Sequence, residues 1–200
     1  MVKTNSKNVL EQFKKKKVLV IGDVMLDHYI YGNVTRISPE APVPILNKTD
    51  EDYVLGGAGN VANNLASLGA KVSLAGIVGD DYGFKILNEL FLKANINTEA
   101  ILVISERSTI QKERLVAKYQ HMIRLDTEDT SSLNASEEKE LLDLVRKQVK
   151  LCDGIILSDY AKGLFSLNLA QSIIKLAKNS GNQYLQILNQ KIKNFLRGLM

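Results

Sequence analysis

A glycine pair that leads into a helical pattern is the feature that most constrains how this chain can fold. Residues 56–70 read GGAGNVANNLASLGA. Within this stretch Val61, Leu65 and Leu68 are spaced to lie on one face of a helix, and Gly69 is a typical helix-ending residue. The segment therefore predicts a turn followed by a helix from about residue 58 to residue 68.

The start of this helix is a candidate binding site. Gly56 and Gly57 permit backbone angles with positive φ and leave the main chain uncovered. The first N–H groups of a helix lack partners within it and lie at the positive end of its dipole, so they attract oxygen-rich ligands. The amides of Asn60 and Asn63 can also bond sugar hydroxyls. The alternative interpretation is that the glycines only allow close packing at a loop–helix junction.

The size and composition of the chain indicate one globular domain, or one domain with a small appendage. It has 200 residues, of which 45% are hydrophobic, and a net charge of +4. The basic run at residues 14–17 has no aromatic residues between its lysines, which argues against nucleic acid as a partner. No apolar run approaches the roughly 20 residues that span a bilayer, and no signal-peptide core is present. We therefore predict a cytoplasmic protein without nucleic-acid or membrane partners.

Residues that commonly form disulfides or bind metals are few. Cys152 is the only cysteine, so an internal disulfide is excluded. Its place after an apolar helical pattern predicts a small core residue rather than a nucleophile. His28 and His121 are far apart in the sequence and no cluster of Cys or His accompanies them, so we predict no transition-metal site.

Strand and helix patterns alternate along most of the chain. The predicted strands are 17–21, 71–77, 100–104 and 154–157. The predicted helices are 58–68, 82–94, 134–151 and 166–178. Such alternation is typical of an α/β fold with a largely parallel sheet and helices on both faces. Ligands of these sheets bind at the carboxyl ends of the strands, and just past such ends the sequence has Asp23, Asp27, Asp80, Asp81 and Asp159.

Two segments interrupt the alternation. Residues 29–47 contain all three prolines of the chain, and proline suits the edges and turns of a small sheet rather than a central parallel strand. Residues 109–125 include a run in which Ile110, Lys112, Arg114, Val116 and Lys118 alternate with other side chains. We predict that the two segments pair into a small antiparallel flap, or lid, over the strand ends.

Six phrases of the sequence together resemble the ribokinase-like, or phosphofructokinase-B type, carbohydrate kinases. In chain order they are GDVMLDHYIYGNVTRISPEAPVP, GGAGNVANNLASLGA, GIVGDDYG, RSTIQKERLVA, IRLDTE and LSDYAKG. They span about residues 17–178. RISPEAPVP and SDYAKG are the most specific, and within the family the phrases are most similar to the branch that phosphorylates heptose phosphates.

The resemblance implies a fold, a reaction and a set of ligands. The fold is a ribokinase-like α/β domain with a β lid that often forms a homodimer contact. The reaction is transfer of the γ-phosphoryl group of ATP, with Mg²⁺, to a sugar hydroxyl. In the heptose branch the acceptor is O1 of D-glycero-β-D-manno-heptose 7-phosphate, in the synthesis of ADP-heptose for the lipopolysaccharide core.

The same resemblance gives individual residues expected roles. The sugar pocket is expected to be lined by Asp27, Gly56, Gly57 and Asn60. An ionised carboxylate such as that of Asp27 accepts hydrogen bonds without donating, which suits a ligand with many hydroxyls. The phosphates and magnesium of the nucleotide are expected near Asp159 and Lys162, where the lysine would neutralise charge during transfer. The alternative for either aspartate is that it only caps a turn.

A substrate that already carries a phosphate requires cations. Lys112 and Arg114 are two residues apart and therefore share one face of a lid strand. A guanidinium binds phosphate through two parallel hydrogen bonds, so both residues are candidates for the 7-phosphate. Arg36, beside the proline-rich turn, is a weaker candidate. The alternative is a solvated strand face.

The resemblance does not extend over the end of the sequence. The family's GAGD phrase, whose aspartate is the catalytic base, does not occur in it. No catalytic residue is therefore assigned, and the 200-residue chain is expected to be inactive. After residue 178 the family has a strand and then a phrase like VDPK, and we predict that residues 183–194, which read QYLQILNQKIKN, have neither. We predict a kinase portion at residues 1–178, with its C-terminal third missing, and an atypical tail at 179–200. Because a shifted reading frame can encode DPKPKN here, we also predict a frameshift near residue 182, so that residues 183–200 are not native sequence.

Two alternatives to a heptose kinase remain. One is a ribokinase-like kinase for another sugar, and the other is a non-catalytic sugar-binding or dimerising remnant. A dinucleotide oxidoreductase is excluded because it requires GxGxxG directly after the first strand, where this sequence reads DVMLD.

Overall fold

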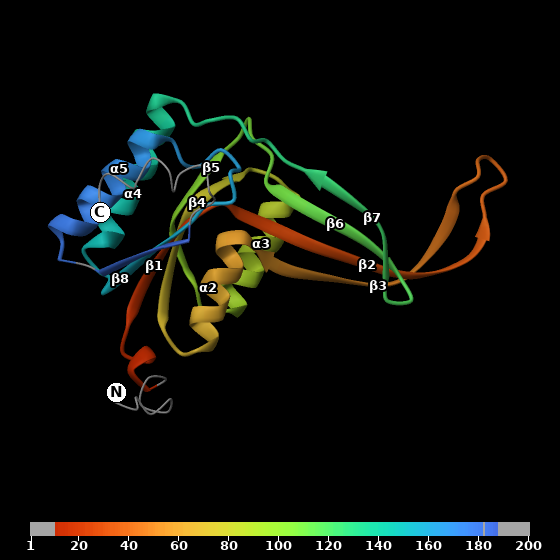
Figure 1. Ribbon diagram of the computed structural model, residues 1–200, viewed down its shortest axis with the longest axis horizontal. Helices are drawn as coiled ribbons and strands as arrows, with labels where there is room; N and C mark the ends of the chain where they lie inside the picture. The colour runs from red at the N-terminus through yellow and green to blue at the C-terminus, as the bar shows by residue number, and fades with distance from the viewer. Residues whose placement is uncertain (1–10, 182, 188–200) are drawn as a thin grey trace.

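The chain forms a parallel α/β layer structure from which a second sheet projects (Figure 1). The computed structural model describes residues 11–181 and 183–187. The first sheet has the strand order β5-β4-β1-β8-β9 in this part of the chain. All of its neighbouring strands pair in parallel, as the alternation of the sequence predicts.

The strands of the parallel sheet start and end close to the predicted positions. They are β1 (Lys17–Gly22), β4 (Lys71–Gly79), β5 (Asn97–Ile104), β8 (Gly154–Ser158) and β9 (Gln183–Ile187). In β1, Leu19 and Ile21 belong to the core on one face of the sheet, whereas Val20 belongs to the core on the other. All three side chains are fully buried. A continuous apolar run is what a strand covered on both faces requires.

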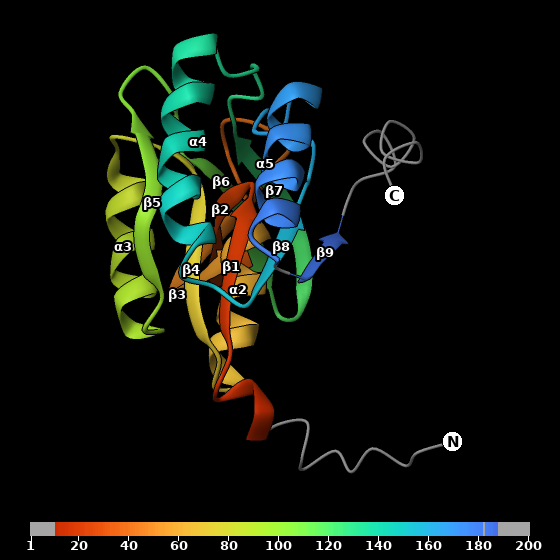
Figure 2. The ribbon, with the colours of Figure 1, turned by 90° about the vertical axis from the view of Figure 1, so that its left-hand side faces the viewer.

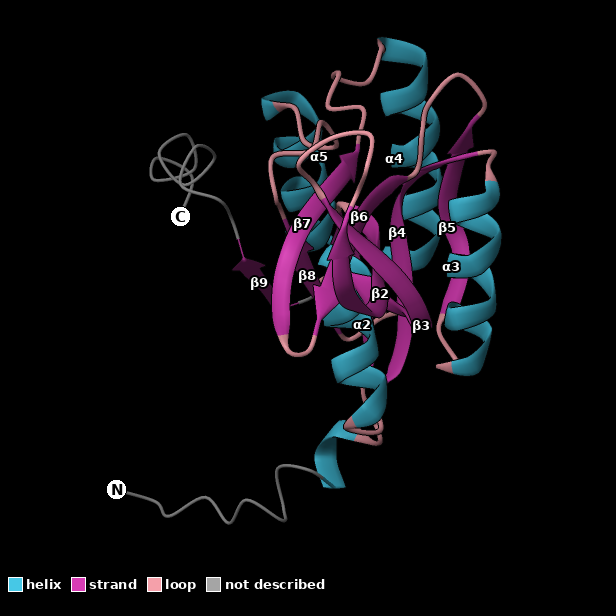
Figure 3. Cartoon of the chain, turned by 90° about the vertical axis from the view of Figure 1, so that its right-hand side faces the viewer, coloured by secondary structure: helices cyan, strands magenta, loops and turns pink. Residues whose placement is uncertain are grey.

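Helices cover both faces of this sheet. They are α2 (Gly57–Ser67), α3 (Tyr82–Lys93), α4 (Ala135–Val149) and α5 (Leu167–Asn179). Helices α4 and α5 lie over one face (Figure 2), and α2 and α3 over the other (Figure 3). Side chains fix where the last three begin, because Asp81, Asn134 and Ser166 each accept a hydrogen bond from the first turn. Among the helices of the described residues, none is long and apolar enough to cross a membrane.

Helix α2 confirms the prediction from the glycine-rich segment with one correction. Val61 and Leu65 pack against the core between α2 and the sheet, and Ala58 and Ala62 are fully buried within it. Leu68 is 44% exposed. It is the C-cap residue, where the chain leaves the helix axis, so the predicted apolar face ends one turn earlier than its spacing suggested.

The second sheet is the predicted lid, but its pairing differs from the prediction. Its strands are β2 (Val24–Ile37), β3 (Pro44–Gly56), β6 (Ile110–Ala117) and β7 (Gln120–Thr127), in the order β3-β2-β6-β7. The β2–β3 and β6–β7 pairs are antiparallel hairpins, whereas β2 and β6 pair in parallel. The lid is therefore mixed rather than antiparallel. The chain enters both hairpins from the carboxyl edge of the parallel sheet, so their first strands run in the same direction.

The predicted absence of a strand after residue 178 is wrong. Strand β9 follows α5 and pairs in parallel with β8, the strand before that helix. This is the βαβ crossover that an α/β fold requires. The last 13 residues of the predicted tail lie outside the described residues. The frameshift near residue 182 stays a prediction, which sequencing the gene across that codon tests.

Candidate functional site

The glycine pair lies where the lid joins the parallel sheet. Gly56 is the last residue of β3 and Gly57 is the first of α2, with a φ of +54°. A Cβ atom on Gly57 would lie 2.3 Å from the carbonyl oxygen of Asp23, so only glycine fits. The Ala58 N–H donates to this same carbonyl at 2.8 Å. The Ala58 N–H is one of the groups at the helix start that were expected to be open to a ligand. Instead it bonds the helix to the residue that follows β1.

Gly56 gives the carboxylate of Asp27 its space. A Cβ atom on Gly56 would lie 2.7 Å from Oδ2 of Asp27. The two residues come from paired strands, because β2 and β3 run antiparallel through this point. Gly56 is itself buried, so its missing Cβ atom makes room for the Asp27 carboxylate. That these two residues line a sugar pocket stays a prediction.

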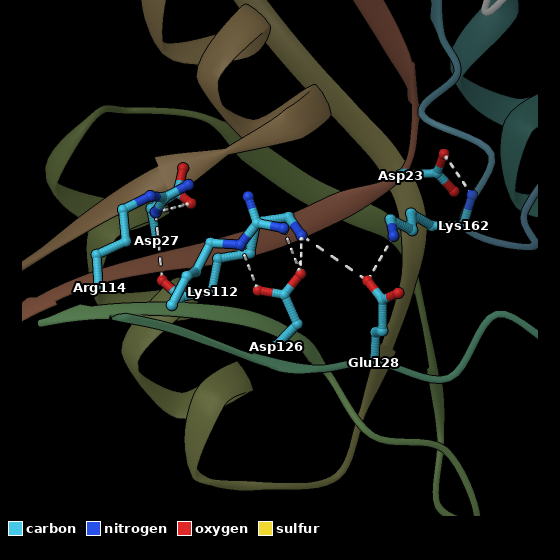
Figure 4. A network of polar contacts seen from close by, with 8 residues as sticks. Asp23, Asp27, Lys112, Arg114, Asp126, Glu128 and Lys162 are labelled. Carbon is cyan, nitrogen blue, oxygen red and sulfur yellow. Dashed lines mark hydrogen bonds and ion pairs between the residues drawn. The ribbon is translucent and has the colours of Figure 1, made fainter. Parts of the chain in front are cut away.

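Asp27 and the two predicted lid cations lie together on one face of the lid, which we term the inner face (Figure 4). In register, Asp27 stands opposite Lys112, and Lys112 stands opposite Asp126. Nη1 of Arg114 donates to Oδ1 of Asp27 at 2.6 Å, and Nζ of Lys112 donates to Oδ2 of Asp126 at 3.0 Å. The structure thus brings Asp27, Lys112 and Arg114 into one cluster from strands β2 and β6. Their assignment to a sugar phosphate stays a prediction.

The cluster contains three residues that the sequence analysis did not assign. Arg124 donates two hydrogen bonds to the Asp126 carboxylate, at 2.8 and 3.0 Å. Hydrogen bonds from Lys112 first, and from Arg124, lower the pKa of Asp126 below its ordinary value. Glu128 lies just beyond the end of β7 and pairs with lysines from two different elements. The IRLDTE phrase holds the signal for these residues, because alternate positions of a strand share a face.

The loop after β8 reaches the same region through Lys162. The ammonium group of Lys162 lies 2.5 Å from Oε2 of Glu128, while its backbone N–H donates to Oδ2 of Asp23 at 3.3 Å. The Asp159 carboxylate accepts from the Ala161 N–H at 2.7 Å and is 7% exposed. In this structure Asp159 therefore holds its own loop, whereas Lys162 faces the lid.

Asp23 is a buried carboxyl group at the centre of this junction. Burial raises its pKa above the ordinary 3.8, and hydrogen bonds from the Tyr160 and Lys162 N–H groups oppose that effect. Its Oδ2 atom accepts from the Tyr160 N–H at 2.7 Å. Among the described residues, neither its Oδ1 atom nor the hydroxyl of Ser158 has a hydrogen-bond partner. Burial also raises the pKa of Asp159.

A buried arginine fastens the end of the lid to this loop. Arg107 is 8% exposed and donates to the carbonyl oxygens of Asp129 and Ser131 at 2.9 and 2.6 Å. Gly163, with a φ of +93°, lies against the same segment, since a Cβ atom there would come within 2.4 Å of the Ser131 carbonyl. The lid exit and the loop after β8 are therefore packed backbone to backbone.

The other candidates lie elsewhere or already have structural partners. Asp81 caps α3 and also accepts from the Thr109 N–H at 2.7 Å, and Asp80 is exposed. Arg36 lies nine residues beyond Asp27, about 30 Å away for an extended strand, next to the last residue of β2. The hairpin of β2 and β3 extends away from the parallel sheet (Figure 1). Asn60 is exposed on the first turn of α2, and its Oδ1 atom is 3.5 Å from the Asn64 amide.

The opposite face of the lid carries a second polar cluster. His28 stacks on Tyr53, with ring centroids 4.1 Å apart, and its two ring nitrogens lie 2.8 Å from Glu51 and 3.3 Å from Glu113. Hydrogen bonds from Lys48 first, then His28, lower the pKa of Glu51 to about 2. These contacts join β2, β3 and β6. In the described part of the chain, no group of three or more His, Cys, Asp and Glu could hold a metal ion.

The far end of the parallel sheet has a cavity of about 680 Å³, lined among others by Lys17, Gly69, Lys71 and Cys152. These residues lie at the amino ends of the strands, away from the cluster on the lid. Cys152 packs partly buried against the core, and burial raises the pKa of its thiol. This agrees with the predicted core role of the cysteine.

Comparisons with known proteins identify relatives over most of the chain. The model of the pfkB family of carbohydrate kinases matches residues 15–199. The bifunctional protein HldE of Aliarcobacter butzleri is 45% identical over 168 residues, which are 84% of this chain and 35% of that protein. HldE of Helicobacter pylori strain J99 is 47% identical over 162 residues, which are 81% of this chain and 35% of that protein. The chain thus spans about a third of the length of these relatives.

Solved structures show the same fold at low sequence identity. A phosphofructokinase-2 from Escherichia coli, crystallised in a tetrameric inhibited form, superposes with a TM-score of 0.63 at 19% identity, over 87% of this chain and 55% of that one. A carbohydrate kinase from Agrobacterium tumefaciens gives a TM-score of 0.62 at 18% identity, over 86% and 53% of the two chains. This chain thus shares the fold of these proteins over most of its length.

Proposed function

We propose that this chain, which belongs to the pfkB family of carbohydrate kinases, forms the sugar-phosphate side of a kinase site. The proposed substrate is D-glycero-β-D-manno-heptose 7-phosphate, phosphorylated at O1 in the cytoplasm. The observation that carries the proposal is the contact between Asp27 and Arg114 beside Gly56. In this contact a carboxylate that could accept hydrogen bonds from sugar hydroxyls lies next to a guanidinium that could bind a phosphate.

The geometry suits a ligand with hydroxyl groups at one end and a phosphate at the other. The Asp27 side chain is 19% exposed and that of Arg114 is 17% exposed, so both retain some access to solvent. Asp27 can accept from sugar hydroxyls on the side not taken by Arg114. Arg114 contacts Asp27 through Nη1, so its other guanidinium nitrogens could bind the phosphate, and Lys112 could bind it in place of Asp126. A low local dielectric strengthens each of these contacts.

Family membership implies ATP as the phosphoryl donor, and ATP would supply the group that is transferred. Of the residues described, Lys162 fits its phosphates best, because its ammonium is held at the edge of the same cluster. Its role would be electrostatic, neutralising charge as it develops. The Asp159 carboxylate is turned to its own loop, so we propose that it positions Lys162 and do not propose it as a ligand of Mg²⁺.

The test is isothermal calorimetry of the 200-residue chain with heptose 7-phosphate. Asp27→Ala should weaken binding by roughly ten- to a hundredfold, because a hydrogen bond to a charged group contributes about 1.5–3 kcal/mol. Asp143→Ala, which removes a surface carboxylate on α4, is the matched control and should bind like the original chain. Unchanged affinity of Asp27→Ala would refute the assignment. If the original chain binds several other sugar phosphates as tightly as heptose 7-phosphate, the result would favour a different natural sugar.

We also propose that the lid forms a homodimer contact. It exposes apolar side chains, among them Met122, Ile123 and Leu125 on β7, and β7 is an edge strand of its sheet. Light scattering during size-exclusion chromatography should give twice the mass of the chain, and Ile123→Lys should reduce it to one chain. A single-chain mass for both proteins would contradict the contact.

A further inference from the structure

One carboxylate connects the lid with the loop after β8. Oε2 of Glu128 lies 2.5 Å from Nζ of Lys162 and 3.8 Å from Nζ of Lys112. The two lysines belong to different parts of the fold. Lys112 is on lid strand β6, and Lys162 lies in the loop after β8 of the parallel sheet. Figure 4 shows Glu128 between them. Both lysines therefore compete for the same oxygen atom.

The position of Glu128 is fixed by its neighbours in the chain. Arg107 donates hydrogen bonds to the carbonyl oxygen of Asp129, which directly follows Glu128, and to that of Ser131. Gly163 packs against the same carbonyl of Ser131. The backbone next to Glu128 is thus held in place and cannot easily move with either lysine. When one lysine moves away from the Glu128 carboxylate, the pairing of that carboxylate with the other lysine must therefore change.

The ion pairs of Glu128 with the two lysines are partly shielded from solvent. The side chains of Lys112, Lys162 and Glu128 are 14%, 20% and 28% exposed. Lys112 has a second partner, Asp126, at 3.0 Å, whereas Glu128 is the carboxylate that Lys162 contacts among the described residues. Charges at this depth are screened less by salt than fully exposed ones.

We propose that Glu128 is a positioning residue that couples the sugar-phosphate end of the site to Lys162. A phosphate that binds Lys112 withdraws this lysine from Glu128, which then pairs with Lys162 alone. Arrival of the sugar phosphate therefore fixes the second lysine in place. The proposal rests on the proposed function, because it requires Lys112 to bind the phosphate of the substrate.

The coupling must act in both directions. Glu128 repels a phosphate at Lys112 and competes with it for the ammonium group, so its removal should strengthen phosphate binding. By linkage, any ligand that changes the Glu128–Lys162 pairing changes the affinity at Lys112 by the same factor. An ion pair of this partly exposed kind corresponds to about a two- to fivefold change in an equilibrium.

The test measures how fast Lys162 is acetylated. The folded 200-residue chain is labelled competitively with acetic anhydride and then digested, and mass spectrometry of the peptides gives the rate at Lys162. Saturating heptose 7-phosphate should slow acetylation of Lys162 by about two- to fivefold. In Glu128→Gln the same ligand should leave the rate unchanged. Calorimetry should show heptose 7-phosphate bound about two- to fivefold more tightly by Glu128→Gln, with unphosphorylated heptose unaffected.

The controls separate coupling from direct contact and from loss of structure. Asp143→Asn removes a surface carboxylate and should retain the protection in full. Glu128→Asp keeps the charge on a shorter side chain and should retain part of it, which serves if Glu128→Gln fails to fold. Equal protection in the original chain and in Glu128→Gln would mean that the ligand touches Lys162 directly, and it would overturn the proposal.

Inorganic phosphate serves as a second probe that does not depend on the sugar. Protection of Lys162 by phosphate but not by heptose 7-phosphate, seen in the original chain and lost in Glu128→Gln, would refute the sugar assignment and support the coupling. Absence of protection by both probes would overturn the coupling, even if calorimetry shows that the heptose binds.

Discussion

The two sheets of this protein use the same backbone geometry for different purposes. In the parallel sheet, β1 buries apolar side chains on both faces, and Leu19, Val20 and Ile21 are fully buried. In the lid, every residue of β7 is exposed, and the inner face carries alternating carboxylates and cations. The parallel sheet is held by burial of apolar surface on both faces. The lid buries apolar side chains where it joins that sheet, such as Leu26 and Leu55, whereas its inner face carries ion pairs that a ligand can replace.

This difference indicates where stability and binding are located. Burial is non-directional and contributes in proportion to apolar area, so the parallel sheet tolerates no loss of volume. Partly exposed ion pairs contribute little to stability, so the cations of the lid can exchange a carboxylate for a phosphate. We therefore expect substitutions in the two sheets to change different measured quantities.

The largest effect is expected for a cavity in the parallel sheet. Leu19→Ala should lower the free energy of unfolding by about 2–5 kcal/mol, because the side chain is completely buried. Leu125→Ala removes the same atoms from a lid residue that is 49% exposed, and it should change stability by no more than about 0.5 kcal/mol. Urea denaturation followed by circular dichroism measures both. Similar losses for the two variants would show that the lid belongs to the same cooperative core.

The next effect is expected in binding rather than in stability. The double variant Lys112→Met and Arg114→Gln should weaken heptose 7-phosphate binding by about ten- to a hundredfold, since it removes two charged partners of the dianion. Unphosphorylated heptose should lose far less, because it presents no phosphate. Arg36→Gln removes a lid cation distant from Asp27 and should bind both sugars normally. Equal losses for both sugars in the double variant would mean that Lys112 and Arg114 are structural.

The smallest effect is a change of stability with pH at the junction of the two sheets. Burial raises the pKa of Asp23 in the folded protein above its ordinary 3.8. The folded state therefore binds this proton more tightly than the unfolded state. The contribution of this proton to stability is fully present below the pKa that Asp23 has in the unfolded state. It is lost as the pH rises through the higher pKa that Asp23 has in the folded state.

Asp23→Asn imitates the neutral carboxyl at every pH and tests this effect. Its stability relative to the original chain should increase as the pH rises above the ordinary aspartate pKa of 3.8, because the buried carboxyl of the original chain loses its proton only above that value. Asp126 and Asp129, whose pKa values are lowered, act in the opposite direction but equally in both proteins, so they cancel in the difference. Urea denaturation at several pH values provides the comparison. A constant difference in stability would show that Asp23 does not titrate in this range.

Local sequence signals predicted most of the helices and strands. The apolar runs of the parallel strands and the apolar faces of the helices depend on residues that are neighbours in the sequence, so their patterns are readable without a structure. The same holds for the place of the glycine pair before α2. The strand after residue 178 was missed because its sequence lacked the phrase expected there, although the βαβ pattern alone called for it.

The candidate site was only partly predictable, because its contacts join distant segments. The sequence alone determined which side chains could act: Asp27 past the first strand, the glycine pair before the helix, and the two cations on alternate positions of a lid strand. Only the tertiary structure decided that β2 and β6 pair in parallel, which places Arg114 against Asp27, 87 residues away. It also decided that Glu128 stands between two lysines. Sequence spacing fixes which residues share a face of one strand, but the register between strands fixes which faces meet, and register is set by the packing of the whole sheet.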